Sequence, residues 1–214
     1  MKPVAKVLYI LSSLSAFLVL ARNVRQGRTG DLDARVTMRL QAIEHPTIRR
    51  LLHDVSWPGF PPQSRILPWL IPGAMLAVAR PFEAGFQLMG WGTGAISGLV
   101  KFIVKRPRPA IPGIEVASAR ISGSSFPSGH VIIYTGVYGM LAYLAHCHIR
   151  FSILRRAVVA LLGGLIALVG PSRVFLGHHW FSDVLASYLL GTSYLMALTT
   201  VYQRARRSRA ILKS

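Results

Sequence analysis

Residues 124–145 read SSFPSGHVIIYTGVYGMLAYLA, a short polar turn that leads directly into an apolar stretch. Proline suits the first turn of a helix, so Pro127 predicts a helix start that leaves the N–H groups of Ser128 and Gly129 unpaired and pointing outward. Glycine lets a ligand approach the main chain closely, and the helix dipole favours an anion there. The same turn is also an ordinary helix start. Its meaning therefore depends on what the rest of the chain places beside it.

Five further apolar runs approach the length of a membrane-spanning helix, about 20 residues. Three are long (4–21, 84–100 and 184–202) and two are short (66–79 and 157–170). Arginines beside the short runs can reach the membrane surface and extend the effective span. The 214-residue chain has 52% hydrophobic residues and a mean hydropathy of +0.44. We therefore expect one all-α domain over residues 1–214, a polytopic integral membrane protein with a six-transmembrane-helix bundle.

The net charge of +18 is also typical of nucleic-acid-binding proteins. The lysines and arginines cluster between apolar runs, however, so no nucleic acid is expected as a partner. The basic tail, residues 203–214, is expected to be cytoplasmic by the positive-inside rule. Six spans then make the N-terminus cytoplasmic and turn the connections after the first, third and fifth spans outward.

The first connection, residues 22–65, is unusually basic for an outward segment, with eight arginines and four acids. Leu32, Val36, Leu40 and Ile43 recur at helical spacing and predict an amphipathic helix lying on the membrane, which Pro46 should end. Such a helix is compatible with anionic headgroups on either face of a membrane, so it does not fix the orientation.

Three smaller features limit other interpretations. Lys2, Lys6 and the run to residue 21 also resemble a signal peptide, although we favour their retention as the first span. The single cysteine, Cys147, excludes an internal disulfide and a cysteine-based metal site. Gly90, Gly94 and Gly98, four residues apart, predict a close helix-packing seam.

Charged and polar residues lie at the ends of three spans, which the six-span topology places on one side. They are KFIVKRPRP at residues 101–109, PSGH at 127–130, and PSRVFLGHHWFSD at 171–183. The cations Lys101, Arg108 and Arg173 suit the oxygens of a phosphate group, and the turn before residue 131 adds main-chain donors. These segments together predict a phosphate site.

Two histidines can supply the chemistry at such a site. His179 and Asp183 are four residues apart, which on a helix puts them in contact. The carboxylate would fix the imidazole tautomer and free the other nitrogen for nucleophilic attack. His130 can then protonate the leaving oxygen. The remaining histidines (His45, His53, His146, His148 and His178) are interpreted as satisfied polar residues.

No metal and no cofactor is expected. A metal-dependent phosphatase needs several carboxylate or mixed ligands. The chain has seven acids, of which four lie in the first connection, and only Asp183 lies beside the histidines.

The three patterns together resemble the type 2 phosphatidic acid phosphatase superfamily. Lys-x6-Arg-Pro is matched by Lys101 and Arg108-Pro109, Pro-Ser-Gly-His by residues 127–130, and Ser-Arg-x5-His-x3-Asp by residues 172–183. The core motifs therefore span residues 101–183.

The resemblance implies a six-helix membrane fold with its site at the outer membrane surface, and it implies a role for each residue. His179 would form a phosphohistidine and would be oriented by Asp183, while His130 would protonate the leaving group and later activate water. The phosphoryl oxygens would be held by Lys101, Arg108, Ser128, Gly129 and Arg173. Trp180-Phe181 and His178 depart from the usual bacterial pattern, which affects the choice of substrate and not the chemistry.

The sequence therefore predicts a metal-independent lipid phosphatase in a membrane, most simply a bacterial cytoplasmic membrane with the site on the periplasmic face. Phosphatidic acid, phosphatidylglycerol phosphate, undecaprenyl diphosphate and lipid A phosphates all remain candidate substrates. Three alternatives stay open: transfer of the phosphoryl group to a second lipid, a vanadium haloperoxidase, and a non-catalytic protein that binds anionic lipids. The sequence does not predict the oligomeric state.

Overall fold

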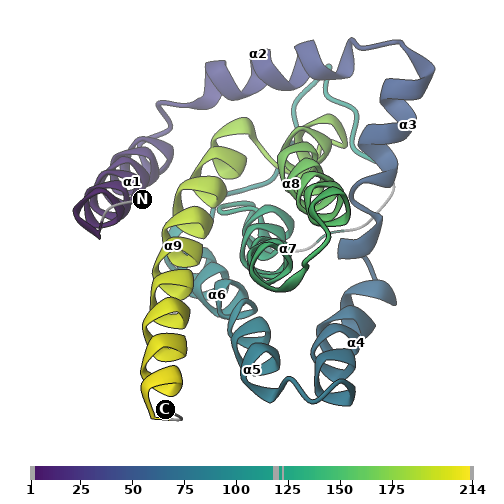
Figure 1. The fold of residues 1–214 in the computed structure, drawn as a ribbon. Coiled ribbons are helices and arrows are strands. Elements are labelled where there is room, and N and C mark those ends of the chain that lie inside the picture. The colour runs from purple at the N-terminus through teal and green to yellow at the C-terminus, as the bar shows by residue number, and fades with distance from the viewer. Residues whose placement is uncertain (1–2, 118–120, 122, 213–214) are drawn as a thin grey trace.

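The computed structural model describes residues 3–117, 121 and 123–212, and every regular element among them is helical. The bundle consists of α1 (Pro3–Arg25), α4 (Gln63–Ala77), α5 (Pro81–Met89), α6 (Gly92–Val104), α7 (Gly129–His148), α8 (Ser152–Phe175) and α9 (Phe181–Ile211). The first connection forms α2 (Gly30–Gln41), α3 (Pro46–Asp54) and the short 3-10 turn η1 (Trp57–Gly59). In Figure 1, α7 lies in the middle of the bundle, and α2 and α3 cross one end of it.

The membrane-spanning character is carried most clearly by α1, α8 and α9, which are long and apolar enough to cross a bilayer. The short apolar run at 157–170 is thus part of a 24-residue helix. The run at 84–100 is divided between α5 and α6 at Gly90 and Trp91, and the run at 66–79 belongs to the 15-residue α4. The protein is an integral membrane helical bundle, whereas the count of six spans stays a prediction.

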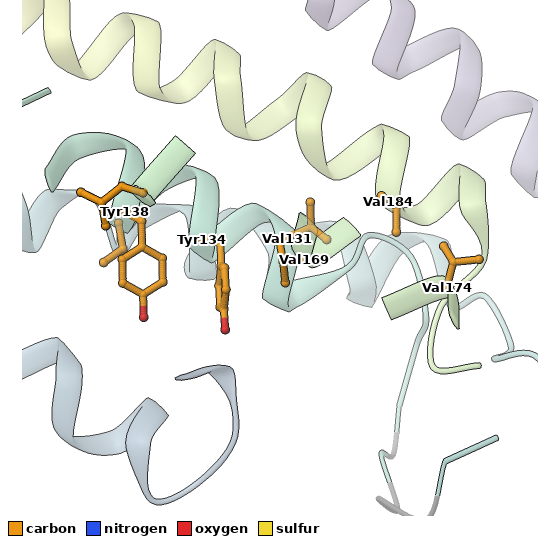
Figure 2. Packing of buried hydrophobic residues seen from close by; sticks show 8 residues of the cluster. Val131, Tyr134, Tyr138, Val169, Val174 and Val184 are labelled. Carbon is orange, nitrogen blue, oxygen red and sulfur yellow. The ribbon is translucent and has the colours of Figure 1, made fainter. Parts of the chain in front are cut away.

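The core lies where α7, α8 and α9 meet. Val131, Tyr134 and Tyr138 of α7 pack with Val169 and Val174 of α8 and with Val184 of α9. Figure 2 shows the two tyrosines projecting from the same side of α7. Within a bilayer the lipid tails are as apolar as these side chains, so van der Waals packing between the helices stabilises the contact. This packing holds the start of α7, which carries the motif at 127–130, beside the end of α8 and the start of α9, which carry the motif at 172–183.

The predicted glycine seam is only partly present. Gly90 lies against Gly136 of α7, where an added Cβ on Gly136 would be 2.5 Å from the Gly90 carbonyl oxygen. Gly94 has ordinary contact with Ile133, and Gly98 faces open space. The close approach therefore occurs at the break between α5 and α6 and does not continue along α6.

Helix α1 packs along α9 through polar as well as apolar contacts. Ser13 Oγ donates to the Leu189 carbonyl at 2.9 Å, and Lys6 Nζ donates to Gln203 Oε1 at 2.8 Å. These contacts favour α1 as a member of the bundle. The retention of residues 1–21 stays a prediction.

The predicted amphipathic helix in the first connection is α2, and Pro46 begins α3 after a break, as expected. The face that α2 turns toward the bundle carries buried Asp33 and Thr37, while Leu32 is 46% exposed. Leu40 alone of the predicted apolar stripe packs against the core cluster of α7, α8 and α9. A location of α2 at the membrane surface stays a prediction.

Candidate active site

The three predicted motifs meet at one end of the bundle through bonds between their loops. The loop after α6 pairs with the loop before α7, because Arg106 N donates to Ser124 Oγ at 3.0 Å and Ser125 N donates to the Arg106 carbonyl at 2.8 Å. Trp180, at the start of α9, donates from Nε1 to the Pro107 carbonyl at 3.1 Å. Segments that are distant in sequence are thus joined into a single cluster.

The start of α7 differs from the sequence prediction. Pro127 lies before the helix, Ser128 is the N-cap, and α7 begins at Gly129. The Ser128 N–H is not unpaired, since the Asp183 carbonyl accepts from it at 3.4 Å. Ser128 Oγ, in contrast, is buried and has no hydrogen-bond partner among the described residues. The side chain of Ser128 is therefore a donor available to a ligand.

His179 has a defined tautomer. Its Nδ1 lies 2.7 Å from the Ser125 carbonyl oxygen, which can only accept, so Nδ1 carries the proton. Its Nε2 lies 3.3 Å from Nη1 of Arg108, which can only donate. Burial lowers the pKa of His179 to about 4, and the neighbouring Asp183 opposes this shift only in part. At neutral pH the Nε2 lone pair is therefore free of a proton, as a nucleophile requires.

His179 and Asp183 are in contact, but they do not share a helix as the spacing suggested. Helix α9 begins at Phe181, because Asp183 Oδ2 accepts from the Trp180 N–H at 2.9 Å and so caps the helix. His179 precedes this cap, and its Nδ1 lies 3.6 Å from Asp183 Oδ2. The Ser125 carbonyl is thus the nearer acceptor, and Asp183 provides a negative charge behind the ring.

Arg173, in the last turn of α8, carries the strongest sign of an anion site. Its side chain is 0% exposed, and none of its three guanidinium nitrogens has a hydrogen-bond partner among residues 3–117, 121 and 123–212. The guanidinium lies 5.1 Å from the centre of the Phe60 ring. Burying an unpaired charge is costly. A buried arginine whose donors have no partner in the described part of the chain is chemically suited to an anion.

The other two predicted phosphate-binding cations converge on one carbonyl group. Lys101 Nζ donates to the Ser124 carbonyl at 2.6 Å, and Arg108 Nη2 lies 3.5 Å from the same oxygen. Arg108 also donates from Nη1 to the His178 carbonyl at 2.7 Å. Both cations are thereby held beside His179.

His130 lies in the first turn of α7 with Nε2 buried and without a hydrogen-bond partner in the described part of the chain. Its ring is 5.0 Å from that of Phe60, which also covers Arg173. His130 and Gly129 line a cavity of about 310 Å³. Apolar residues form much of the remaining wall, among them Leu67, Trp91, Ile133, Tyr134 and Val137. His130 therefore lies between the cationic cluster and an apolar space.

The other histidines are only partly as predicted. His148 is satisfied, since its Nε2 lies 2.8 Å from the Tyr202 hydroxyl. His178 is 2% exposed, and its Nε2 lies 3.3 Å from the Ala117 carbonyl, but its Nδ1 has no hydrogen-bond partner among the described residues. Burial lowers the pKa of His178 to about 4. His178 is thus a neutral, half-satisfied residue beside the site.

Several residues that line the site were not predicted individually. Gly59 ends η1 and Phe60 follows it, and a Cβ on Gly59 would collide with the His130 ring. Arg106 contacts two buried carboxylates, Asp33 and Asp183. One available signal was the scarcity of acids, because Asp33 is among only seven in a chain with 25 lysines and arginines. Within the described residues, no group of three or more histidine, cysteine or acidic side chains is arranged to hold a metal ion.

Comparisons with known proteins found relatives that are named as phosphatases. Phosphatidylglycerophosphatase B of Bacillus subtilis (strain 168) is 27% identical over 212 residues, covering 97% of this chain and 98% of the relative. The decaprenylphosphoryl-5-phosphoribose phosphatase of Mycobacterium tuberculosis (strain CDC 1551 / Oshkosh) is 28% identical over 186 residues, covering 83% of this chain and 96% of the relative.

Among solved structures, the crystal structure of a transmembrane PAP2 type phosphatidylglycerolphosphate phosphatase from Bacillus subtilis superimposes with a TM-score of 0.79. The two chains are 25% identical, and the match covers 91% of this chain and 96% of the other. The PAP2 superfamily model matches residues 85–207, which include all three motifs and more than half of the chain. The chain therefore belongs to the PAP2 superfamily.

Proposed function

We propose that this PAP2-family membrane phosphatase hydrolyses the terminal phosphate of a membrane lipid without a metal ion, through a phosphohistidine on His179. The observation that carries the proposal is the buried guanidinium of Arg173, which has no hydrogen-bond partner among the described residues and lies in a cluster with the neutral imidazole of His179. An enclosed cation without a counterion suits a phosphoryl group that binds there during turnover.

The reaction then proceeds in two steps. Nε2 of His179 attacks phosphorus, the bond to the lipid oxygen breaks, and His130 in its imidazolium form gives a proton to that oxygen and becomes the neutral imidazole. Water next attacks the phosphorus of the phosphohistidine while His130 accepts its proton, which releases phosphate and restores His179. Lys101, Arg108, Arg173, Ser128 and Gly129 hold the phosphoryl oxygens during both steps.

The position of His130 supports a lipid as the leaving group. The proton donor lies at the wall of the apolar cavity beside α4 and α7, so the group that leaves can be apolar where it enters the bilayer. The Bacillus subtilis relative, 98% of whose length is covered, is named a phosphatidylglycerophosphatase. Phosphatidylglycerol phosphate is therefore our first choice of substrate. A polyprenyl phosphate ester or diphosphate is the second, because another relative is named for a decaprenyl substrate.

The test is hydrolysis of a panel of purified lipid phosphates by the purified protein in mixed micelles, with excess EDTA present. We expect phosphate release from phosphatidylglycerol phosphate to exceed that from phosphatidic acid and undecaprenyl diphosphate. Vanadate, which mimics the five-coordinate phosphorus of the transition state, should inhibit strongly. Activity lost with EDTA and restored by magnesium would contradict the mechanism. Label that moves to a second lipid instead of free phosphate would identify a phosphotransferase.

A further inference from the structure

A buried charge network connects helix α2 to Asp183 through Arg106, which occupies a position that the first family motif leaves unspecified. From it we infer that Arg106 and Asp33 are positioning residues, which act on the His179 nucleophile through Asp183. This inference rests on the proposed function, because it concerns the attack by His179.

The network is built around Arg106, whose side chain is only 11% exposed between two carboxylates that are 0% exposed. Its Nη1 donates to Asp183 Oδ1 at 2.6 Å, and its Nη2 donates to Asp33 Oδ2 at 2.6 Å. Ser182 completes the connection, since its N–H and Oγ donate to Asp33 at 2.8 and 2.7 Å. Each carboxylate thus has several short, charge-assisted bonds, which hold it in one orientation.

The two oxygens of Asp183 consequently have different tasks. Arg106 occupies Oδ1, so Oδ2 is the oxygen that faces Nδ1 of His179 at 3.6 Å and caps α9. Without Arg106, Asp183 would keep the Trp180 N–H bond at Oδ2 but lose the bond at Oδ1, so the carboxylate behind the His179 ring would be held less firmly. A misplaced catalytic group reduces the rate even where binding is intact.

Asp33 keeps the charge of this network suitable for catalysis. Arg106 alone would neutralise Asp183, but the second carboxylate leaves the group of three with a net charge of −1. That charge lies beside Nδ1 of His179, whereas Arg108 lies beside Nε2. The negative charge therefore favours the positive imidazole that forms when Nε2 bonds to phosphorus. Because Asp33 belongs to α2, the first connection takes part in placing the nucleophile.

The experiment measures p-nitrophenyl phosphate hydrolysis by the purified full chain, since this activated ester reports on attack independently of the lipid. The variants are Arg106→Gln, Asp33→Asn, Asp183→Asn and the double variant Arg106→Gln/Asp183→Asn. Matched controls are Lys105→Gln, at the exposed residue beside Arg106, and Asp31→Asn, at the exposed acid on α2. We expect kcat to fall about 10- to 100-fold in Arg106→Gln and Asp33→Asn, by analogy with the loss of outer-shell groups that orient metal-ligating side chains. KM and vanadate inhibition should remain within about threefold of the native values, and both controls should be unchanged.

The double variant separates positioning from general stabilisation. If Arg106 acts through Asp183, adding Arg106→Gln to Asp183→Asn should lower kcat by no more than about twofold. The inference would be overturned if the kcat losses of Arg106→Gln and Asp183→Asn multiplied in the double variant, or if Arg106→Gln kept the native rate. Losses in the controls as large as those in the test variants would also overturn it. Should Arg106→Gln fail to fold, Asp33→Asn and its double variant with Asp183→Asn decide by the same criteria. A native protein that hydrolyses no phosphate ester would refute the proposed function instead.

Discussion

The two catalytic histidine candidates occupy different surroundings, so their removal should have different consequences. His179 lies between the Ser125 carbonyl and Arg108, whereas His130 lies at the wall of the apolar cavity. His179→Ala should abolish formation of a phosphoenzyme. His130→Ala should lose roughly 100- to 10,000-fold on a lipid phosphate, because a lipid alkoxide leaves poorly without a proton. The loss on p-nitrophenyl phosphate should be far smaller, since nitrophenolate needs little help.

Quenched-flow trapping of acid-labile phosphate, together with steady-state rates on both substrates, checks this division of labour. His146→Ala is the matched control, because His146 is exposed and distant from the motifs in sequence. Phosphate trapped on the His179→Ala protein would assign the nucleophile elsewhere. Equal losses on the two substrates in His130→Ala would remove the case for a proton donor.

At the same scale, the sequence predicted which residues lie close together better than it predicted their conformation. From motif spacing and the ends of apolar runs, the sequence predicted a single site that contains Lys101, Arg108, Arg173 and His179. The structure places these four residues together. The spacing of His179 and Asp183 wrongly indicated a shared helix. A local hydrogen bond decided otherwise, since Asp183 caps α9 at Trp180. Such competition between a cap and one more helical turn is hard to read from residue spacing alone.

At the scale of elements, hydrophobic periodicity located most helices but not the faces that they bury. The apolar stripe on α2 predicted a helix correctly, yet the bundle receives its polar side through Asp33. The contact of Asp33 with Arg106 joins residues 73 positions apart and has no local signal. Likewise, the continuous apolar run at 84–100 gave no sign of the break at Gly90, which depends on the close approach of α7. Long-range polar contacts and backbone approach are therefore what the sequence alone left undetermined.

The crossing of α7 with the break between α5 and α6 should be sensitive to a single methyl group. A Cβ on Gly136 would meet the Gly90 carbonyl and the Thr93 side chain at 2.5 and 2.6 Å, so backbone would have to shift. Gly136→Ala is expected to destabilise the protein by about 1–3 kcal/mol. Thermal unfolding in detergent measures this loss. Gly163→Ala is the control, since Gly163 of α8 faces open space and alanine should cause no loss there. Equal unfolding temperatures for Gly136→Ala and the native protein would show that the two helices separate without cost.

At the scale of the whole molecule, helix α9 connects the site to the basic tail. Its 31 residues extend about 46 Å at 1.5 Å per residue, which exceeds the roughly 30 Å hydrocarbon core of a bilayer. Asp183 lies in its first turn, and Arg204, Arg206, Arg207 and Arg209 lie near its other end. The catalytic end and the arginines must therefore lie on opposite sides of a membrane that α9 crosses.

This separation gives a direct test of the proposed periplasmic site and cytoplasmic tail. In a Cys147→Ala background, which removes the single native cysteine, Ile111→Cys marks the catalytic end and Ser208→Cys marks the tail; both positions are exposed. Arginine-rich segments are retained on the cytoplasmic side during insertion. In spheroplasts, a membrane-impermeant maleimide should therefore label Ile111→Cys directly and Ser208→Cys only after permeabilisation. The background protein should remain unlabelled in both conditions. The reverse pattern would place the phosphate site on the cytoplasmic side of the membrane. The lipid headgroup would then be taken from the cytoplasmic leaflet.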